Sequence, residues 1–334
     1  MSPIGGLVSH VRLHGDTGGA GPVVCVAPAG HGRHPEHCPP LVGVGAGADE
    51  AAASHDALRH ALALYAAAGW DAPNMRWASA DELGDDAIPV EDLARVAPLE
   101  LRDRIRWVEG FALDDGRPVW IPAMLVHIGL PVAVEAEAFW PASPAGLSVA
   151  ADIGAAVVVG FLDCAARDAL AVARTKNAAL ACIAEHGDVS VFDATTDVGV
   201  PAAIAQGKAS YEVGIAAGTT LAEACDAAVF DLARRRTRRA FDAYPDEPAP
   251  DPAFDLVAEG EPVRGMRDVS IDVTKPELVA RLRKLGLAGY AVDLTTDELG
   301  AIEMAAVRVV VPGLSPLPPG PGWVDHARLA RVAP

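Results

Sequence analysis

The sequence predicts an α/β fold in which mixed sheets are flanked by helices, with an internal α/β duplication. Three observations support this prediction: helical periodicity at 49–68, two β-rich runs around an Asp-Asp-Gly turn within 105–126, and one short motif that occurs at both 193–197 and 293–297. The chain has 334 residues, of which 51% are hydrophobic and only 5% aromatic. We therefore expect a sizeable core built mainly from Ala, Val and Leu.

Three long helices are expected. The first covers 49–68 and ends at a glycine. The second covers about 153–173 and is apolar almost all round in its first turns, so we expect it to lie in the interior. The third runs from Thr220 to about residue 240, with Glu223 at the spacing of a capping box and an arginine-rich last turn that suits the negative end of a helix.

Strands and shorter helices fill the remaining segments. The region 105–126 is predicted as a hairpin, and 177–192 as a helix over 177–185 followed by a strand over 188–192. Further along, 290–294 and 307–311 are rich in β-forming residues. This order of elements indicates βαβ-like alternation.

The repeated motif reads Asp-Ala-Thr-Thr-Asp at 193–197 and Asp-Leu-Thr-Thr-Asp at 293–297. Each copy is expected to follow a strand that itself follows a helix, and these helices end near Gly187 and Gly286. We interpret the two copies as a duplicated α/β substructure.

Charge and cysteine usage exclude several classes of protein. There are 27 Lys and Arg against 45 Asp and Glu, so a formal charge of -18 would repel nucleic acid and anionic lipid. The longest uncharged run, 118–134, is too short and too interrupted by proline to span a membrane. The five cysteines lack a CxxC pair, which favours reduced thiols over disulfides. We expect a cytoplasmic protein.

Several motifs occur in a characteristic order after the first helix. They are Trp107-Val108-Glu109-Gly110, Ser143-Pro144-Ala145-Gly146-Leu147, Arg167-Asp168 within the second helix, DATTDVGVP at 193–201 and VVVPGLSPL at 309–317. Through this order the sequence resembles the YcaO superfamily. The resemblance spans nearly the whole chain and implies a single YcaO-like domain over 1–334, in which the Pro-rich acidic segment 242–262 forms an exposed loop.

The resemblance also implies a chemistry. YcaO proteins use ATP and Mg²⁺ to activate a peptide backbone amide, giving an azoline or a thioamide. Such a site needs carboxylates on its helices, because Mg²⁺ takes oxygen ligands and bridges phosphates. The positions here that match the family's site helices are His60, Ala63, Gly154, Ala155, Asp163, Ala166, Asp231 and Arg234. Most of the expected carboxylates are therefore absent.

The resemblance and the spacing leave six candidate ligands for ATP if it is bound: Asp163, Arg167, Asp168, Asp231, Arg234 and Arg236. Asp163 and Asp231 are the candidate metal ligands. Arg234 and Arg236 are expected to point inward because they follow Asp231 at spacings of three and five. An altered site could also include Glu109.

Two functions remain open. In the first, the chain is a degenerate accessory or scaffold protein without a cofactor, which binds a peptide substrate, a leader peptide or a catalytic homologue, and which could form a homodimer. In the second, it is an active ATP-dependent cyclodehydratase or a thioamide- or amidine-forming enzyme. A separate cluster, His31, His34, His37 and Cys38, contains zinc-ligand residue types, but its Gly/Pro-rich spacing favours a solvated loop.

Overall fold

The computed structural model describes residues 7–14, 21–30, 34, 36–38, 40–141, 143–176, 180–208, 212–239, 271 and 274–315. The helices are α1 (Glu50–Ala67), α2 (Ala80–Leu83), α3 (Ala123–Val126), α4 (Ile153–Lys176), α5 (Leu221–Arg239), α6 (Lys275–Lys284) and α7 (Asp297–Gly300). The three long helices lie where the sequence predicted them, and α6 ends close to Gly286, as expected. The predicted loop at 242–262 lies outside the described residues.

The strands form three sheets, and neighbouring strands within each sheet run antiparallel. The first sheet contains β1 (Arg12–Leu13), β2 (Val23–Pro28) and β3 (Val42–Gly47). The second has the order β11 (Val213–Ala217), β10 (Ala202–Gly207), β9 (Val189–Asp193) and β8 (Cys182–His186). The third has the order β4 (Arg76–Ala78), β5 (Ile105–Ala112), β12 (Tyr290–Asp293), β13 (Ala305–Val310) and β7 (Leu147–Ala150), with β6 (Pro118–Pro122) paired to β5.

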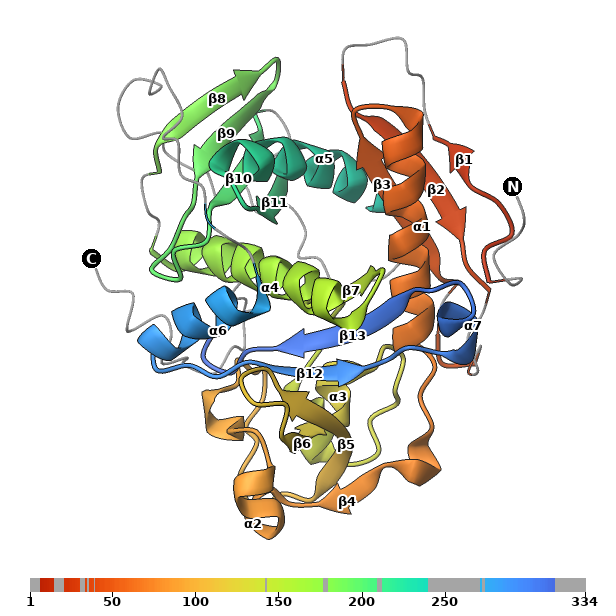
Figure 1. The fold of residues 1–334 in the computed structure, drawn as a ribbon, viewed down its shortest axis with the longest axis vertical. Coiled ribbons are helices and arrows are strands. Elements are labelled where there is room, and N and C mark those ends of the chain that lie inside the picture. Colours follow the sequence, from red (N-terminus) through yellow and green to blue (C-terminus); the bar gives the residue numbers. More distant parts are fainter. Residues whose placement is uncertain are drawn as a thin grey trace.

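The long helices join the three sheets (Figure 1). Helix α1 packs on β3 of the first sheet, and α5 packs on β10 and β11 of the second. Helix α4 contacts β7 and β13 of the third sheet on one side and β10 and β11 of the second on the other. The small apolar residues that dominate the composition allow these close helix-to-sheet contacts.

The predicted helix over 177–185 is wrong in the part that the structure describes. Residues 182–186 form strand β8, which pairs with β9 in a hairpin. Gly187 makes this hairpin possible because its φ of 60° lies in the left-handed region that favours glycine. The apparent helical pattern was too short to distinguish a helix from a strand.

The expectation that the first turns of α4 are buried on all sides is also wrong. Ala156, Val157 and Phe161 are buried, but the side chains of Ile153 and Val159 are 40% and 48% exposed. An apolar helix is buried all round only where other elements cover every face, and one face of α4 borders a pocket instead.

The two motif copies share one local hydrogen-bonding pattern. In each copy, the first Asp accepts a hydrogen bond from the backbone N–H of the first Thr, at 2.9 Å for Asp193 and 2.8 Å for Asp293. The hydroxyl of that Thr accepts one from the backbone of the next strand, at 3.2 Å from Ala202 and 3.1 Å from Ala306. The elements before the copies differ, because the β8–β9 hairpin precedes the first copy whereas α6 and β12 precede the second.

Two further expectations concern the whole chain. All five cysteines are free, as their spacing predicted, and the structure shows that all five are buried. Within the described ranges, no helix combines the length and the hydropathy that crossing a bilayer requires.

Candidate functional site

A pocket of about 480 Å³ lies where the three long helices meet. Its walls come from α1, α4 and α5, and its remaining lining comes from β3, β7 and β11. Figure 1 shows α4 and α5 crossing the middle of the molecule with α1 beside them. The pocket thus brings together helices that are far apart in the sequence.

Helical periodicity determines which side chains reach the pocket. The lining residues of α4 are Val159, Leu162, Asp163 and Ala166, and those of α5 are Ala227, Phe230, Asp231 and Arg234. Both sets follow the same spacing of three, four and seven residues, which places them on one helix face. From α1 come Ala52, Asp56, Arg59, His60 and Ala63. Each helix therefore presents a single stripe to the pocket.

Asp163 sits at the partly exposed wall of the pocket, with 30% of its side chain accessible. Its Oδ2 accepts hydrogen bonds from the backbone N–H of Gly146 at 2.7 Å and from Nε of Arg167 at 2.8 Å. Gly146 has a φ of 74°, and a Cβ there would lie 2.2 Å from the carbonyl oxygen of Val309. The carboxylate of Asp163 therefore anchors the loop before β7, and Arg167 on the same helix balances its negative charge.

Asp231 is the most deeply buried acid of the pocket, with 4% of its side chain exposed. Its carboxylate accepts hydrogen bonds from the backbone N–H of Ile215 at 2.9 Å, from Nε of Arg234 at 3.1 Å and from Arg235. Burial alone would raise the pKa of Asp231, but the charges of Arg235 and Arg234 hold it well below its usual range. Asp231 is thus an ionised structural anchor between α5 and β11.

Helix α1 contributes a neutral imidazole and a third aspartate. Nδ1 of His60 lies 3.0 Å from the backbone nitrogen of Val44 and 3.1 Å from its carbonyl oxygen. Burial, followed by the charges of Arg238 and Arg234, lowers the pKa of His60 well below its usual value, so the ring is neutral at neutral pH. Oδ2 of Asp56 accepts a hydrogen bond at 3.1 Å from the backbone N–H of Ala46, which ties α1 to β3.

The structure places the six predicted ligands in four different surroundings. Asp163, Asp231 and Arg234 line the pocket, and Arg167 stands behind Asp163 as its ion-pair partner. Asp168 is fully buried outside the pocket lining, where it accepts a hydrogen bond at 2.9 Å from the backbone N–H of Ser315. Because Ser315 follows β13, this hydrogen bond ties the segment after the third sheet to α4.

Arg236 does not point into this pocket. It forms an ion pair at 2.7 Å with Glu212 and lines a second cavity of about 810 Å³ on the other side of α5, together with His186 and Asp188. A spacing of five residues places it on a different helix face from Asp231. Glu109, the remaining acid of the altered site, is exposed on β5 and does not line the pocket.

Sequence reasoning missed Asp56 and Arg59. Both lie on the α1 face that carries His60 and Ala63, at spacings of four and seven residues before Ala63 for Arg59 and Asp56. That spacing was the available signal, because residues three, four and seven apart share a helix face.

The described residues do not fit a bound Mg²⁺. This ion needs several oxygen ligands at about 2.1 Å, yet the pocket wall carries His60, Ala63 and Ala166 at positions where the resemblance led us to expect carboxylates. Asp163 and Asp231 are engaged by arginines and backbone N–H groups. In the part of the chain that the structure describes, no group of three or more His, Cys, Asp or Glu side chains could hold a metal.

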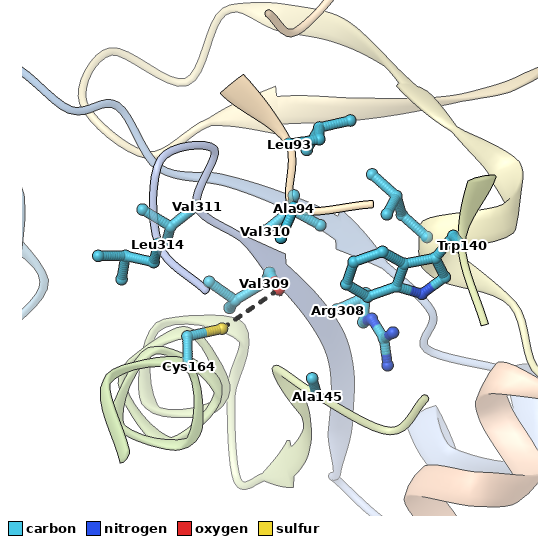
Figure 2. A pocket seen from close by; sticks show the side chains of 11 residues that line it. Leu93, Ala94, Trp140, Ala145, Cys164, Arg308, Val309, Val310, Val311 and Leu314 are labelled. Atoms are coloured by element: carbon cyan, nitrogen blue, oxygen red, sulfur yellow. Dashed lines mark hydrogen bonds between the residues drawn. The ribbon is translucent and has the colours of Figure 1, made fainter. Parts of the chain in front are cut away.

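A separate small cavity between α4 and β13 has a buried thiol in its lining (Figure 2). It measures about 20 Å³, enough for about one water molecule, and Trp140, Cys164 and Arg308 contribute to its lining. Figure 2 shows Sγ of Cys164 directed at the carbonyl oxygen of Val309, to which it donates a hydrogen bond at 3.6 Å. Burial raises the pKa of the Cys164 thiol to about 12, so this group is no nucleophile.

The histidine cluster packs against an aromatic ring. His34 stacks on Trp70 with their ring centroids 3.4 Å apart, and its Nε2 lies 2.8 Å from the carbonyl oxygen of Trp70. Cys38 is buried and donates to the carbonyl oxygen of Ile128 at 3.6 Å. His31 lies outside the described residues. The described part of the cluster thus makes packing and backbone contacts.

A family model described as YcaO cyclodehydratase, ATP- and Mg²⁺-binding, matches residues 44–315. No curated protein matches the sequence. Among solved structures, the chain is similar to YcaO from Methanopyrus kandleri bound with AMPPCP and Mg²⁺, at 21% identity and a TM-score of 0.73, covering 94% of this chain and 88% of that one.

Two further structures share the fold. One is a heterocyclase in complex with substrate and cofactor, at 18% identity and a TM-score of 0.68, where 94% of this chain matches 51% of that one. The chain thus spans about half the length of that heterocyclase. The other is the E. coli microcin synthetase McbBCD complex with pro-MccB17 bound, at 13% identity and a TM-score of 0.65, covering 91% of this chain and 88% of that one.

Proposed function

Because this chain belongs to the YcaO family, we propose that it takes part in the modification of ribosomally made peptides as an accessory protein rather than as an ATP-dependent enzyme. In this role it binds a peptide substrate, a leader peptide or a catalytic homologue. The proposal treats residues 1–334 as one YcaO-like domain.

One observation carries the proposal: the carboxylates of Asp163 and Asp231 in the pocket are engaged by arginines and backbone N–H groups. His60 is neutral and bonded to the β3 backbone. Asp231 is buried beneath two arginines, and Asp163 is bonded to Arg167 and Gly146. Moving either aspartate to a metal would leave a buried arginine or N–H group without its partner, at a cost of about 1–3 kcal/mol per group.

The alternative function is an active cyclodehydratase or a thioamide- or amidine-forming enzyme that uses ATP and Mg²⁺. It is favoured by one specific observation, which is that Asp56, Asp163 and Asp231 from three separate helices face one pocket. A pocket of about 480 Å³ is within the range of small-molecule sites. In this case the arginines would have to release at least one carboxylate on binding.

The structural relatives support a partner-dependent role. The McbBCD complex contains partner proteins, and one of its structures holds pro-MccB17. By analogy, we propose a peptide and a catalytic homologue as partners, with a homodimer as the form without them. The free, buried cysteines support a cytoplasmic location.

Calorimetric titration with ATP and Mg²⁺, combined with a phosphate-release assay, tests the proposed function. The accessory role predicts no phosphate release above that of the Asp163→Ala and Asp231→Ala variants, with or without Mg²⁺. Asp226→Ala is the matched control, because Asp226 lies on α5 but lines the cavity on the opposite side. Phosphate release that needs Mg²⁺, is lost in both pocket variants and persists in the control would establish the enzyme instead.

A further inference from the structure

We infer that the second cavity, on the other side of α5 from the pocket, binds a short extended peptide segment that carries a basic side chain next to apolar ones. We call it the hairpin cavity, because the turn of the β8–β9 hairpin forms one of its walls. This inference rests on the proposed function, in which the chain binds a peptide or a partner protein, and adds where such a segment binds and what its composition is. It involves no covalent step.

Three separate parts of the chain enclose the hairpin cavity. The turn residues His186, Gly187 and Asp188 form one wall, residues 21–22 and Ala48 of the first sheet's ends form another, and one face of α5 forms the floor. Figure 1 shows α5 between the β8–β9 hairpin and β3. The cavity measures about 810 Å³, which is within the range of ligand sites.

The floor of the hairpin cavity is apolar. Val229, Phe230 and Ala233 lie on it, and spacings of three and four residues place them on one face of α5. Phe230 and Ala233 pack against the buried apolar residues of β2 and β3, yet all three floor residues are only partly buried. Apolar side chains of a ligand would complete the burial of this floor. From Val229 to Arg236, α5 rises about 10 Å, the length of about three residues of extended chain.

The charged groups of the hairpin cavity favour a cation. Two aspartates and one arginine line it, besides His186. The arginine, Arg236, donates a hydrogen bond from Nε to Oε2 of Glu212 at 2.7 Å, whereas its Nη2 lies 3.6 Å from Oδ2 of Asp188. Glu212 therefore balances the charge of Arg236. Asp188 is 66% exposed and is held only by the longer contact, so its carboxylate is placed to meet a cation of a ligand.

Floor and charge together define the class of ligand. An anion would meet the aspartates unfavourably, and a compact metal ion would leave the apolar floor uncovered. A peptide segment satisfies both parts, because it can place apolar side chains on Val229 and Phe230 and a Lys or Arg beside Asp188.

Fluorescence anisotropy with short synthetic peptides tests this inference on the full chain. The probe is fluorescein-labelled Gly-Lys-Val-Leu-Val-Gly with blocked ends. One comparison peptide has Glu in place of Lys, and the other has Ser in place of the three apolar residues. At low ionic strength we expect saturable binding of the probe, at least about fivefold weaker binding of the Glu peptide and at least about tenfold weaker binding of the Ser peptide.

Asp188→Lys decides the assignment of the charged end. In this variant the Glu peptide should bind more tightly than the probe, because the cation now belongs to the protein. Asp86→Lys is the matched control, since it makes the same change of net charge at an exposed position after α2 that does not line the hairpin cavity. Its preference for the probe should stay within about twofold of the parent's.

Val229→Ser tests the floor and should weaken binding of the probe at least about fivefold. Thermal melting confirms that each variant is folded. No saturable binding of the probe up to about 1 mM overturns the inference. An equal loss of preference in Asp188→Lys and Asp86→Lys also overturns it, because the preference would then come from the net charge of the whole molecule.

Both of these outcomes leave the accessory role intact, since a partner protein can bind another surface. Mg²⁺-dependent phosphate release together with the expected peptide preference overturns the accessory role and supports the hairpin cavity as a peptide site.

Discussion

Away from the pocket, Arg106 on β5 of the third sheet pairs with a buried glutamate from the segment before β7. Glu137 is fully buried, and its carboxylate accepts hydrogen bonds from Arg106 at 2.7 Å through Nε and at 2.6 Å through Nη2. It also accepts from the backbone N–H of Ala133 at 2.9 Å. Because no water can replace these partners, each charge depends on the other.

Removing Glu137 should therefore destabilise the protein strongly. We expect Glu137→Ala to lower the free energy of unfolding by about 3–5 kcal/mol, since it leaves Arg106 charged and buried. Urea denaturation measures this change. Glu100→Ala, which removes the exposed partner of Arg102, should cost less than about 1 kcal/mol. Equal effects of the two substitutions would contradict this account.

A second single residue, Asp231 in the pocket, makes the stability of the folded protein depend on pH. The pKa of Asp231 is lowered in the folded state, as is that of Glu137, because arginines and backbone N–H groups outweigh burial. Each group therefore contributes stability that is present above its unfolded pKa of about 4 and is lost as the pH falls through the lower folded value.

We expect the urea midpoint to fall progressively as the pH is lowered from about 5 to 3. Asp231→Asn should have a lower urea midpoint at pH 7, because its side chain has no charge for the arginines to stabilise. Its midpoint should also fall less on acidification, because asparagine has no carboxylate that could be protonated. A midpoint of the parent protein that is unchanged between pH 5 and 3 would rule out this coupling.

At the scale of elements, the contact between α1 and β3 positions the first wall of the pocket. A Cβ at Gly45 would lie 2.0 Å from the backbone nitrogen of Ala57 and 2.4 Å from the carbonyl oxygen of Ala53. Both are backbone atoms of α1, which cannot move aside as a flexible side chain could. The absence of a side chain at Gly45 is therefore what lets Asp56 and His60 reach the strand.

Gly45→Ala should lower the free energy of unfolding by about 1–3 kcal/mol, as overpacking does in a tight interface. Gly300→Ala is the control, since a Cβ at Gly300 meets nothing within 4 Å, and it should be neutral or slightly stabilising. Chemical denaturation of both variants distinguishes the two sites. A Gly45→Ala protein as stable as its parent would show that α1 can shift away from β3 without cost.

For the whole molecule, core packing determines the chemistry of the cysteines. All five are free and buried, and burial raises the pKa of Cys164 to about 12 and that of Cys225 to about 11. Thiolate formation in the folded state is therefore suppressed.

The folded protein should react slowly with a thiol reagent such as DTNB at pH 8, and all five thiols should react after unfolding in urea. Colorimetric counting of released thiolate in both states measures this difference. Rapid modification of even one cysteine in the folded protein would mean that the described core opens locally.

Much of the architecture could be predicted from local patterns. The helical periodicity over 49–68 predicted α1, and the structure adds that Asp49 is its N-cap. Thr220 and Glu223 also marked the start of α5, although Glu223 accepts its backbone hydrogen bond from Thr219 rather than from Thr220. Strand β8 was missed because a five-residue segment carries too little periodicity.

The sequence by itself determined the three long helices and the family's order of motifs, because caps and helical periods are encoded by residues close together in the chain. Only the tertiary structure decided that Asp231 pairs with the backbone of Ile215, that Arg236 faces another cavity and that Val159 stays exposed. These features depend on which distant element covers each helix face, and that information is distributed over the whole chain.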